Sequence, residues 1–240
     1  MIDPTILTAI VYRLGALFTL IISFYFLASY IRTRDKLILY LFICFFLVCL
    51  QGTLPFLIAF KIVTDPIIMS YIHVVSSSLL FMTLLFGIEI LFFLTGKYFH
   101  RFEADVMSMA LLVICLFVIL VLILNPQPPT LSDMGMIYWN AYPLANYVML
   151  IVAAVYGIIW LTLFYKASTA VEDLYPKAKL VLIGIDGFTF GIVGILAHLS
   201  QSYIQSLISH VLFSVVGIIS FIFFTFPKFS TKILRIFSKI

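Results

Sequence analysis

Seven long apolar runs account for most of this sequence, and they restrict the chain to very few folds. They occupy roughly residues 6–31, 37–60, 67–96, 104–124, 144–166, 178–200 and 204–226. A helix of about 20 residues crosses the hydrocarbon core of a bilayer, and a mean hydropathy of +1.23 is far above that of a soluble domain. The runs therefore predict an all-α, polytopic membrane protein, in which residues 1–240 form a single bundle of seven transmembrane helices.

The basic residues predict how the bundle is oriented in the membrane. Of the 14 Lys and Arg residues, all except Arg13 and Lys61 fall in the first, third and fifth connecting segments and in the carboxyl-terminal tail. Cytoplasmic segments carry the excess of such residues. We therefore expect the amino terminus outside and the carboxyl terminus inside, in a multi-pass protein of the cell membrane.

The carboxyl-terminal tail has its own pattern. Lys232, Arg235 and Lys239 alternate with apolar residues, which is typical of a short amphipathic helix on anionic lipids of the inner leaflet. The net charge of +4 fits this lipid partner, and no nucleic-acid partner is expected.

Small and polar residues recur at helical spacing in the last two runs. Gly184, Gly187, Gly191 and Gly194 share one face of the sixth run with His198, and His210 lies on a polar stripe of the seventh. In lipid, glycine faces allow two helix backbones to approach closely. The pattern predicts a tightly packed hairpin of the two helices, or a ridge that docks other membrane chains.

Polar side chains from several runs are expected at one level near the outer surface. Polar groups facing lipid are costly, so we expect these side chains to line a pocket that opens outward. The candidate ligand-binding residues are Arg13, Gln51, His73, Ser77, His198 and His210. Arg13 would bind an anionic group, and the proline-rich segment 125–143 would either cover the pocket or simply connect two helices.

Two other interpretations of this layer remain open. His73, His198 and His210 are candidate ligands of a divalent metal or of haem iron in a subunit of a membrane enzyme complex, because neutral imidazole is a common metal ligand. No HxxH, HxxxH or HExxH pair supports such a site. Alternatively, the histidines only satisfy interfaces within an accessory subunit. No cofactor is required, and no catalytic motif is recognised, so a role other than that of an enzyme is favoured.

Two carboxyl groups, Glu89 and Asp186, lie within the apolar runs toward the cytoplasmic side. We expect no basic side chain at their level. At least one of the two is then predicted to carry a proton and to donate a hydrogen bond.

The first 55 residues or so resemble the beginning of the seven-helix sensor domains of prokaryotic signalling proteins. The similarity lies in Leu14–Ala16, Tyr30–Lys36 and Leu50–Gly52, together with the helix count and the expected orientation. This resemblance implies a receptor or sensor-like module that recognises a small ligand or a partner and passes a helix shift to the cytoplasmic side.

Overall fold

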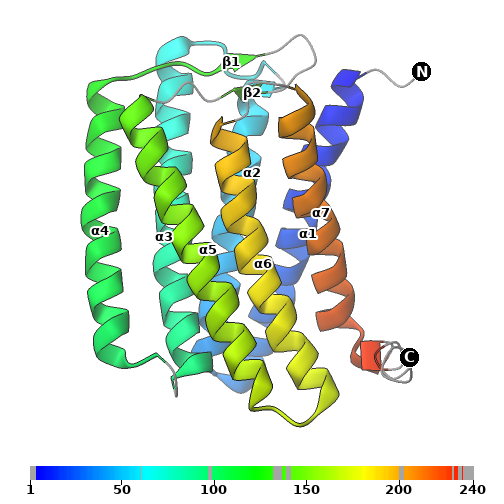
Figure 1. The fold of residues 1–240 in the computed structure, drawn as a ribbon. Helices are drawn as coiled ribbons and strands as arrows, with labels where there is room; N and C mark the ends of the chain where they lie inside the picture. Colours follow the sequence, from blue (N-terminus) through cyan, green and yellow to red (C-terminus); the bar gives the residue numbers. More distant parts are fainter. Residues whose placement is uncertain are drawn as a thin grey trace.

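A computed structural model of the 240-residue chain gives a bundle of long helices (Figure 1). It describes residues 4–59, 61–96, 99–131, 137–138, 142–199, 203–228, 230–231 and 234. For some helical residues the side chain is not described; these include residues 4–15, 194–199 and 210.

Seven helices and one very short hairpin make up the described part of the chain. The helices are α1 (Pro4–Thr33), α2 (Lys36–Ala59), α3 (Pro66–Thr95), α4 (Arg101–Leu124), α5 (Pro143–Thr169), α6 (Leu174–Leu199) and α7 (Tyr203–Thr225). Strands β1 (Thr130–Leu131) and β2 (Ile137–Tyr138) pair antiparallel within the segment between α4 and α5. We call the end of the bundle that carries these strands the hairpin end, and the opposite end the charged end.

Turn residues with a clear local role separate the helices. Asp65 caps α3 by accepting hydrogen bonds at Oδ1 from the backbone N–H groups of Ile67 (2.8 Å) and Ile68 (3.2 Å), and Pro66 begins the helix. Asp35 accepts in the same way from the N–H of Leu37 at the start of α2. At the starts of α2 and α3, polar residues thus interrupt the apolar runs and satisfy free N–H groups of the helix that follows.

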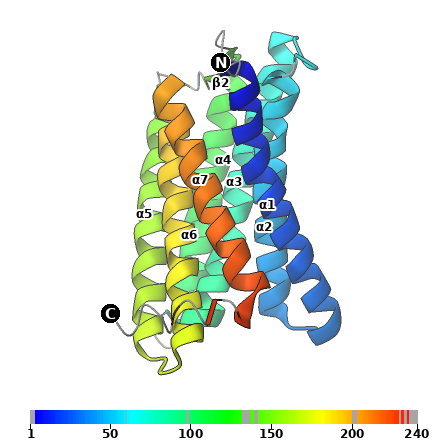
Figure 2. The same ribbon diagram turned by 90° about the vertical axis from the view of Figure 1, so that its right-hand side faces the viewer.

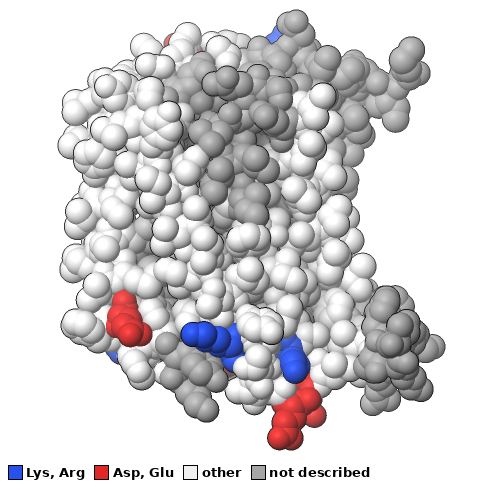
Figure 3. All heavy atoms as spheres, viewed as in Figure 1, with Lys and Arg blue, Asp and Glu red and all other residues white. Residues whose placement is uncertain are grey.

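Over the residues that the structure describes, six helices are long and apolar enough to cross a membrane: α1, α2, α3, α4, α5 and α7. The predicted all-helical membrane architecture is confirmed at this level. Large apolar side chains face outward along the helices, for example Met109 and Leu116, which are 64% and 60% exposed. In Figure 3 most of the Lys, Arg, Asp and Glu atoms on the visible face lie at the charged end, with a few at the hairpin end, and the described atoms in the middle of that face are uncharged. Such a surface suits lipid.

The helices form a closed ring. Each packs against the next, and α7 returns to pack against α1 (Figure 2). Helix α4 has most of its length on the outside, because α3 and α5 also contact each other directly behind it. The core between the helices is apolar and aromatic, and includes Phe81, Ile88, Leu91 and Phe164.

Candidate functional site: a cavity at the centre of the helix ring

A cavity of about 110 Å³ lies inside the ring. Six helices contribute to its wall, and α4 does not. The lining residues are Thr19, Leu41, Cys44, Phe45, Val48, Thr83, Leu84, Gly87, Ile90, Tyr156, Trp160, Ile183, Asp186, Gly187, Thr189, Phe190, Val216, Gly217 and Ser220. A space bordered by six helices responds to any rearrangement of the ring.

The cavity lies near the middle of the helices. Asp186 is the thirteenth of 26 residues in α6, and Tyr156 is the fourteenth of 27 in α5. In helices that cross a bilayer, this position is close to the centre of the hydrocarbon core, where polar groups must be satisfied by the protein or by a ligand.

Asp186 is the one acidic residue among those lining residues, and none of them is Lys, Arg or His. Its carboxyl group faces Ser220 on α7, whose Oγ lies 2.7 Å from both Oδ1 and Oδ2. Ser220 is only 1% exposed, whereas Asp186 keeps part of its surface open. The hydroxyl group donates one hydrogen bond to the carboxyl group, so part of the carboxyl surface remains facing the cavity.

Tyr156 and Trp160 of α5 form the aromatic wall, and glycines on two other helices make room for them. A Cβ atom at Gly87 would lie 1.7 Å from the Tyr156 hydroxyl oxygen, and one at Gly187 would lie 2.2 Å from Trp160 Cδ1. The indole Nε1–H also donates a 2.6 Å hydrogen bond to the carbonyl oxygen of Ile183. The aromatic pair thus joins α5 to both α3 and α6.

The glycine pattern of the sixth run therefore has a different partner from the one predicted. Gly187 faces Trp160 of α5, and a Cβ atom at Gly191 would meet the carbonyl oxygen of Ala153 at 2.7 Å. Glycine permits close approach as expected, but the approach is to α5. Gly194 lies outside the described side chains.

Three other polar side chains of the wall, Thr19, Cys44 and Thr83, lie against nearby backbone carbonyls. The hydroxyl groups of Thr19 and Thr83 donate to the carbonyl oxygens of Ala16 and Leu79, each at 2.9 Å. The Cys44 thiol lies 3.4 Å from the Thr83 carbonyl oxygen. Such bonds satisfy hydroxyl donors inside an apolar bundle, so the wall presents mainly apolar surface together with the Asp186 carboxyl group.

The structure describes three of the predicted pocket residues: Gln51, His73 and Ser77. They lie between the cavity and the hairpin end, on the faces of α2 and α3 that line the cavity. Gln51 follows Cys44 by seven residues on α2, and Ser77 precedes Leu84 by seven on α3. Seven residues are about two helical turns. His73, one further turn outward, is 3% exposed and Ser77 is 2% exposed. Gln51 Oε1 and Ser77 Oγ have no hydrogen-bond partner among the described residues.

The other half of the predicted pocket lies outside the described side chains: Arg13, His198 and His210. Among the side chains that are described, no three His, Cys, Asp or Glu residues lie close enough to hold a metal ion. The described polar residues thus lie between the cavity and the hairpin end. There Ile137 of β2 packs against Ile58 and Ile72, over the ends of α2 and α3.

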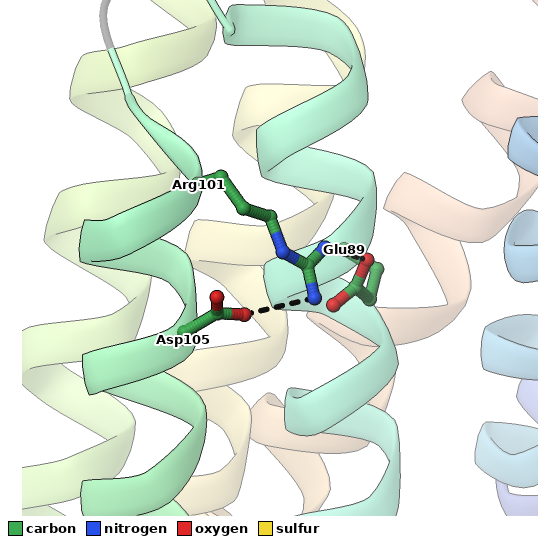
Figure 4. Close-up of polar contacts among 3 residues, drawn as sticks. All are labelled: Glu89, Arg101 and Asp105. Carbon is green, nitrogen blue, oxygen red and sulfur yellow. Dashed lines mark hydrogen bonds and ion pairs between the residues drawn. The ribbon is translucent and has the colours of Figure 1, made fainter.

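The expectation that Glu89 has no basic neighbour is wrong. Arg101, at the start of α4, places Nη1 2.8 Å from Glu89 Oε2 and Nη2 2.8 Å from Asp105 Oδ1 (Figure 4). The sequence predicts that Arg101 lies in the connecting segment before residue 104, but α4 begins at Arg101 and brings it beside the last turns of α3. Glu89 therefore belongs to an ion-pair network at the charged end.

Helices α6 and α7 are joined again at the charged end. The Tyr175 hydroxyl donates a 2.9 Å hydrogen bond to the carbonyl oxygen of Phe223. Lys179 Nζ lies 4.8 Å from the centroid of the Tyr175 ring and 5.3 Å from that of Phe224. These contacts lie on the same pair of helices as the bond between Asp186 and Ser220.

The predicted site and the cavity share few residues. Asp186 was singled out from the sequence, but Ser220, Tyr156 and Trp160 were not, since each lies in an apolar run without a motif. A signal did exist for Trp160: it is one of only two tryptophans, and its run lies beside a glycine-rich one. No protein-family model, curated protein or solved structure matches the chain.

Proposed function

We propose that this chain is a receptor or sensor-like membrane module with seven spans, which binds a small ligand inside the helix ring. The observation that supports this most strongly is the central cavity, because six helices meet there around a single buried carboxyl group. Ligand sites in helical bundles are commonly apolar cavities between helices with a few polar groups. The resemblance of the first 55 residues to prokaryotic sensor domains agrees with this proposal.

We place the hairpin end outside and the charged end inside the cell. The distribution of Lys and Arg supports this orientation. It also places Gln51, His73 and Ser77 between the outer surface and the cavity, where they would line the path of an entering ligand. Arg13, His198 and His210 would complete this path, and the basic tail would lie on anionic lipids of the inner leaflet.

The contacts between α6 and α7 suggest how binding would be transmitted. A ligand that bonds to Asp186 shares this carboxyl group with Ser220, the residue that joins α7 to α6 beside the cavity, and so changes the contact between the two helices. The same two helices meet at the charged end through Tyr175 and Phe223. A change in their packing at the cavity would therefore reach the cytoplasmic surface, and other membrane chains could read it there. A ligand shifts such an equilibrium only if it binds the two arrangements differently.

A cavity-filling variant tests the proposal. Val216 lines the cavity, whereas its neighbour Val215 is 46% exposed on the outer surface of α7. We expect Val216→Phe to occupy the cavity and Val215→Phe to leave it open. The purified protein would carry spin labels on two introduced cysteines, Lys177→Cys and Lys228→Cys. It would be screened against a panel of small molecules for a change in the distance between the two labels.

The proposal requires at least one compound that changes this distance in the Val215→Phe protein and not in the Val216→Phe protein. Equal responses in both variants would show that the cavity is not the binding site. A panel that leaves the distance unchanged in the unmodified protein would count against transmission between α6 and α7.

A further inference from the structure

We infer that the ligand of the central cavity is a small organic ammonium ion, held by Asp186 and by the aromatic wall. This inference rests on the proposed function, and it adds the chemical class of the ligand. Three features of the cavity carry it: the charge of the lining residues, the chemistry of the walls and the available volume.

Ionised Asp186 gives the lining residues one negative charge, and no lining residue supplies a positive one. A cation bound beside Asp186 favours this ionised form over the protonated form that the sequence predicts. Asp186 is the only acidic residue among the lining residues, and no Lys, Arg or His is present. Ser220 Oγ lies close to both carboxyl oxygens, but its single O–H group can donate only one hydrogen bond. A cation would therefore find an acceptor with remaining capacity, whereas an anion would find no charged partner in this wall.

The remaining walls suit a cation that carries apolar groups. Phe45, Tyr156, Trp160 and Phe190 line the cavity, and aromatic faces attract ammonium groups, most strongly where water is excluded. The Trp160 ring is fixed by its 2.6 Å bond to the carbonyl oxygen of Ile183. An alkylated ammonium ion thus combines apolar contact with aromatic and carboxylate attraction, whereas a hydrated metal ion would lose its water without replacement ligands.

The volume limits the ligand to a few heavy atoms. The cavity measures about 110 Å³, whereas an apolar cavity of about 150 Å³ accommodates benzene. Tetramethylammonium, with five heavy atoms, is therefore a suitable probe. The uncharged molecule tert-butanol has the same number of heavy atoms and a similar shape, and so separates charge from size.

Trp160 supplies a local signal for the experiment. The chain has two tryptophans, Trp139 and Trp160, so a Trp139→Phe protein reports on the cavity wall alone. In this background we would titrate tetramethylammonium chloride and tert-butanol, with sodium chloride at matched ionic strength as the blank. We expect tetramethylammonium to change the Trp160 emission with an affinity at least about tenfold above that of tert-butanol, a ratio that corresponds to about 1.4 kcal/mol.

The variants assign the effect to the cavity. Asp186→Asn, which can still accept a hydrogen bond from Ser220, should lower the tetramethylammonium affinity toward that of tert-butanol and leave only the attraction of the aromatic wall. Val216→Phe should abolish both responses, and Val215→Phe should change neither. The comparison of tetramethylammonium with tert-butanol in the parent protein tests the preference for a charged ligand even where a variant fails to fold.

Three outcomes would overturn the inference. If both probes bind equally and Val216→Phe abolishes both, the cavity binds small molecules without regard to charge, and the proposed function stands without the ammonium class. If the tetramethylammonium response survives in Val216→Phe, the cation binds elsewhere. If neither probe changes the emission, a small ammonium ion is not the ligand.

Discussion

The indole ring of Trp160 fills the space beside Gly187 that a side chain at this position would need. The two residues come from α5 and α6, and the indole Nε1–H is bonded to the Ile183 carbonyl one turn away. This arrangement fixes one wall of the central cavity. Substitutions at Gly187 therefore test directly whether Trp160 forms this wall of the cavity.

We expect Gly187→Ala to destabilise the protein. The new Cβ atom would lie 2.2 Å from Trp160 Cδ1, so the indole must move and lose its bond to Ile183. Overpacking of this kind costs about 1–3 kcal/mol in the free energy of unfolding, which thermal or denaturant unfolding in detergent would measure. Gly217→Ala is the matched control, because its Cβ atom would lie 3.8 Å from Phe18 Cβ. Equal stability of the two variants would contradict the packing of Trp160 against Gly187.

Gly87 and Tyr156 should be energetically coupled. A Cβ atom at Gly87 would lie 1.7 Å from the tyrosine hydroxyl oxygen, the closest of its contacts. Tyr156→Phe removes that oxygen, so Gly87→Ala should cost less stability in the Tyr156→Phe background than in the parent protein. The relief is expected to be incomplete, because Trp160 Cζ3 would remain at 2.9 Å. A double-mutant cycle of unfolding free energies measures the coupling, and additive costs would argue against this contact.

Ser220→Ala should destabilise the bundle by about 1–3 kcal/mol, because the Asp186 carboxyl group would lose its hydrogen-bond partner in an apolar setting. Ser78→Ala is a suitable control, since the Ser78 hydroxyl only bonds to the Val74 carbonyl of its own helix. Unfolding in detergent would compare the two. We expect Asp186→Asn to cost less than Ser220→Ala, since the amide oxygen still accepts from Ser220. The reverse order would mean that the charge of Asp186, and not this bond, stabilises the bundle.

The sequence predicts the helices well because each apolar run is long and is ended by polar or proline residues. It predicts the contacts between helices poorly, because apolar runs look alike on all sides. Arg101 and Glu89 are twelve residues apart across the turn between α3 and α4. Their pairing was missed because α4 was expected to begin at residue 104, after Arg101. Ser220 lies 34 residues from Asp186, and nothing in its own apolar segment distinguishes it.

The ion-pair network at the charged end should respond asymmetrically to substitution. Arg101→Ala leaves the carboxylates of Glu89 and Asp105 without the cation that lies between them, whereas Glu89→Gln leaves Arg101 paired with Asp105. We therefore expect Arg101→Ala to lower the melting temperature more than Glu89→Gln does. The Arg101→Ala/Glu89→Gln double variant should regain part of the loss. Because Arg101 is largely exposed, added salt should reduce these differences. A salt-independent difference would indicate lost packing instead.

Cysteine labelling tests the proposed orientation of the bundle. Lys61, between α2 and α3 at the hairpin end, and Lys166, in the last turn of α5 at the charged end, are both exposed. The three native cysteines are buried, so they should contribute little background labelling. A membrane-impermeant maleimide added to intact cells should label Lys61→Cys and leave Lys166→Cys unmodified until the membrane is permeabilised. The opposite pattern would place the hairpin end inside the cell. The path through Gln51, His73 and Ser77 would then open to the cytoplasm, and the sensor would read an internal ligand.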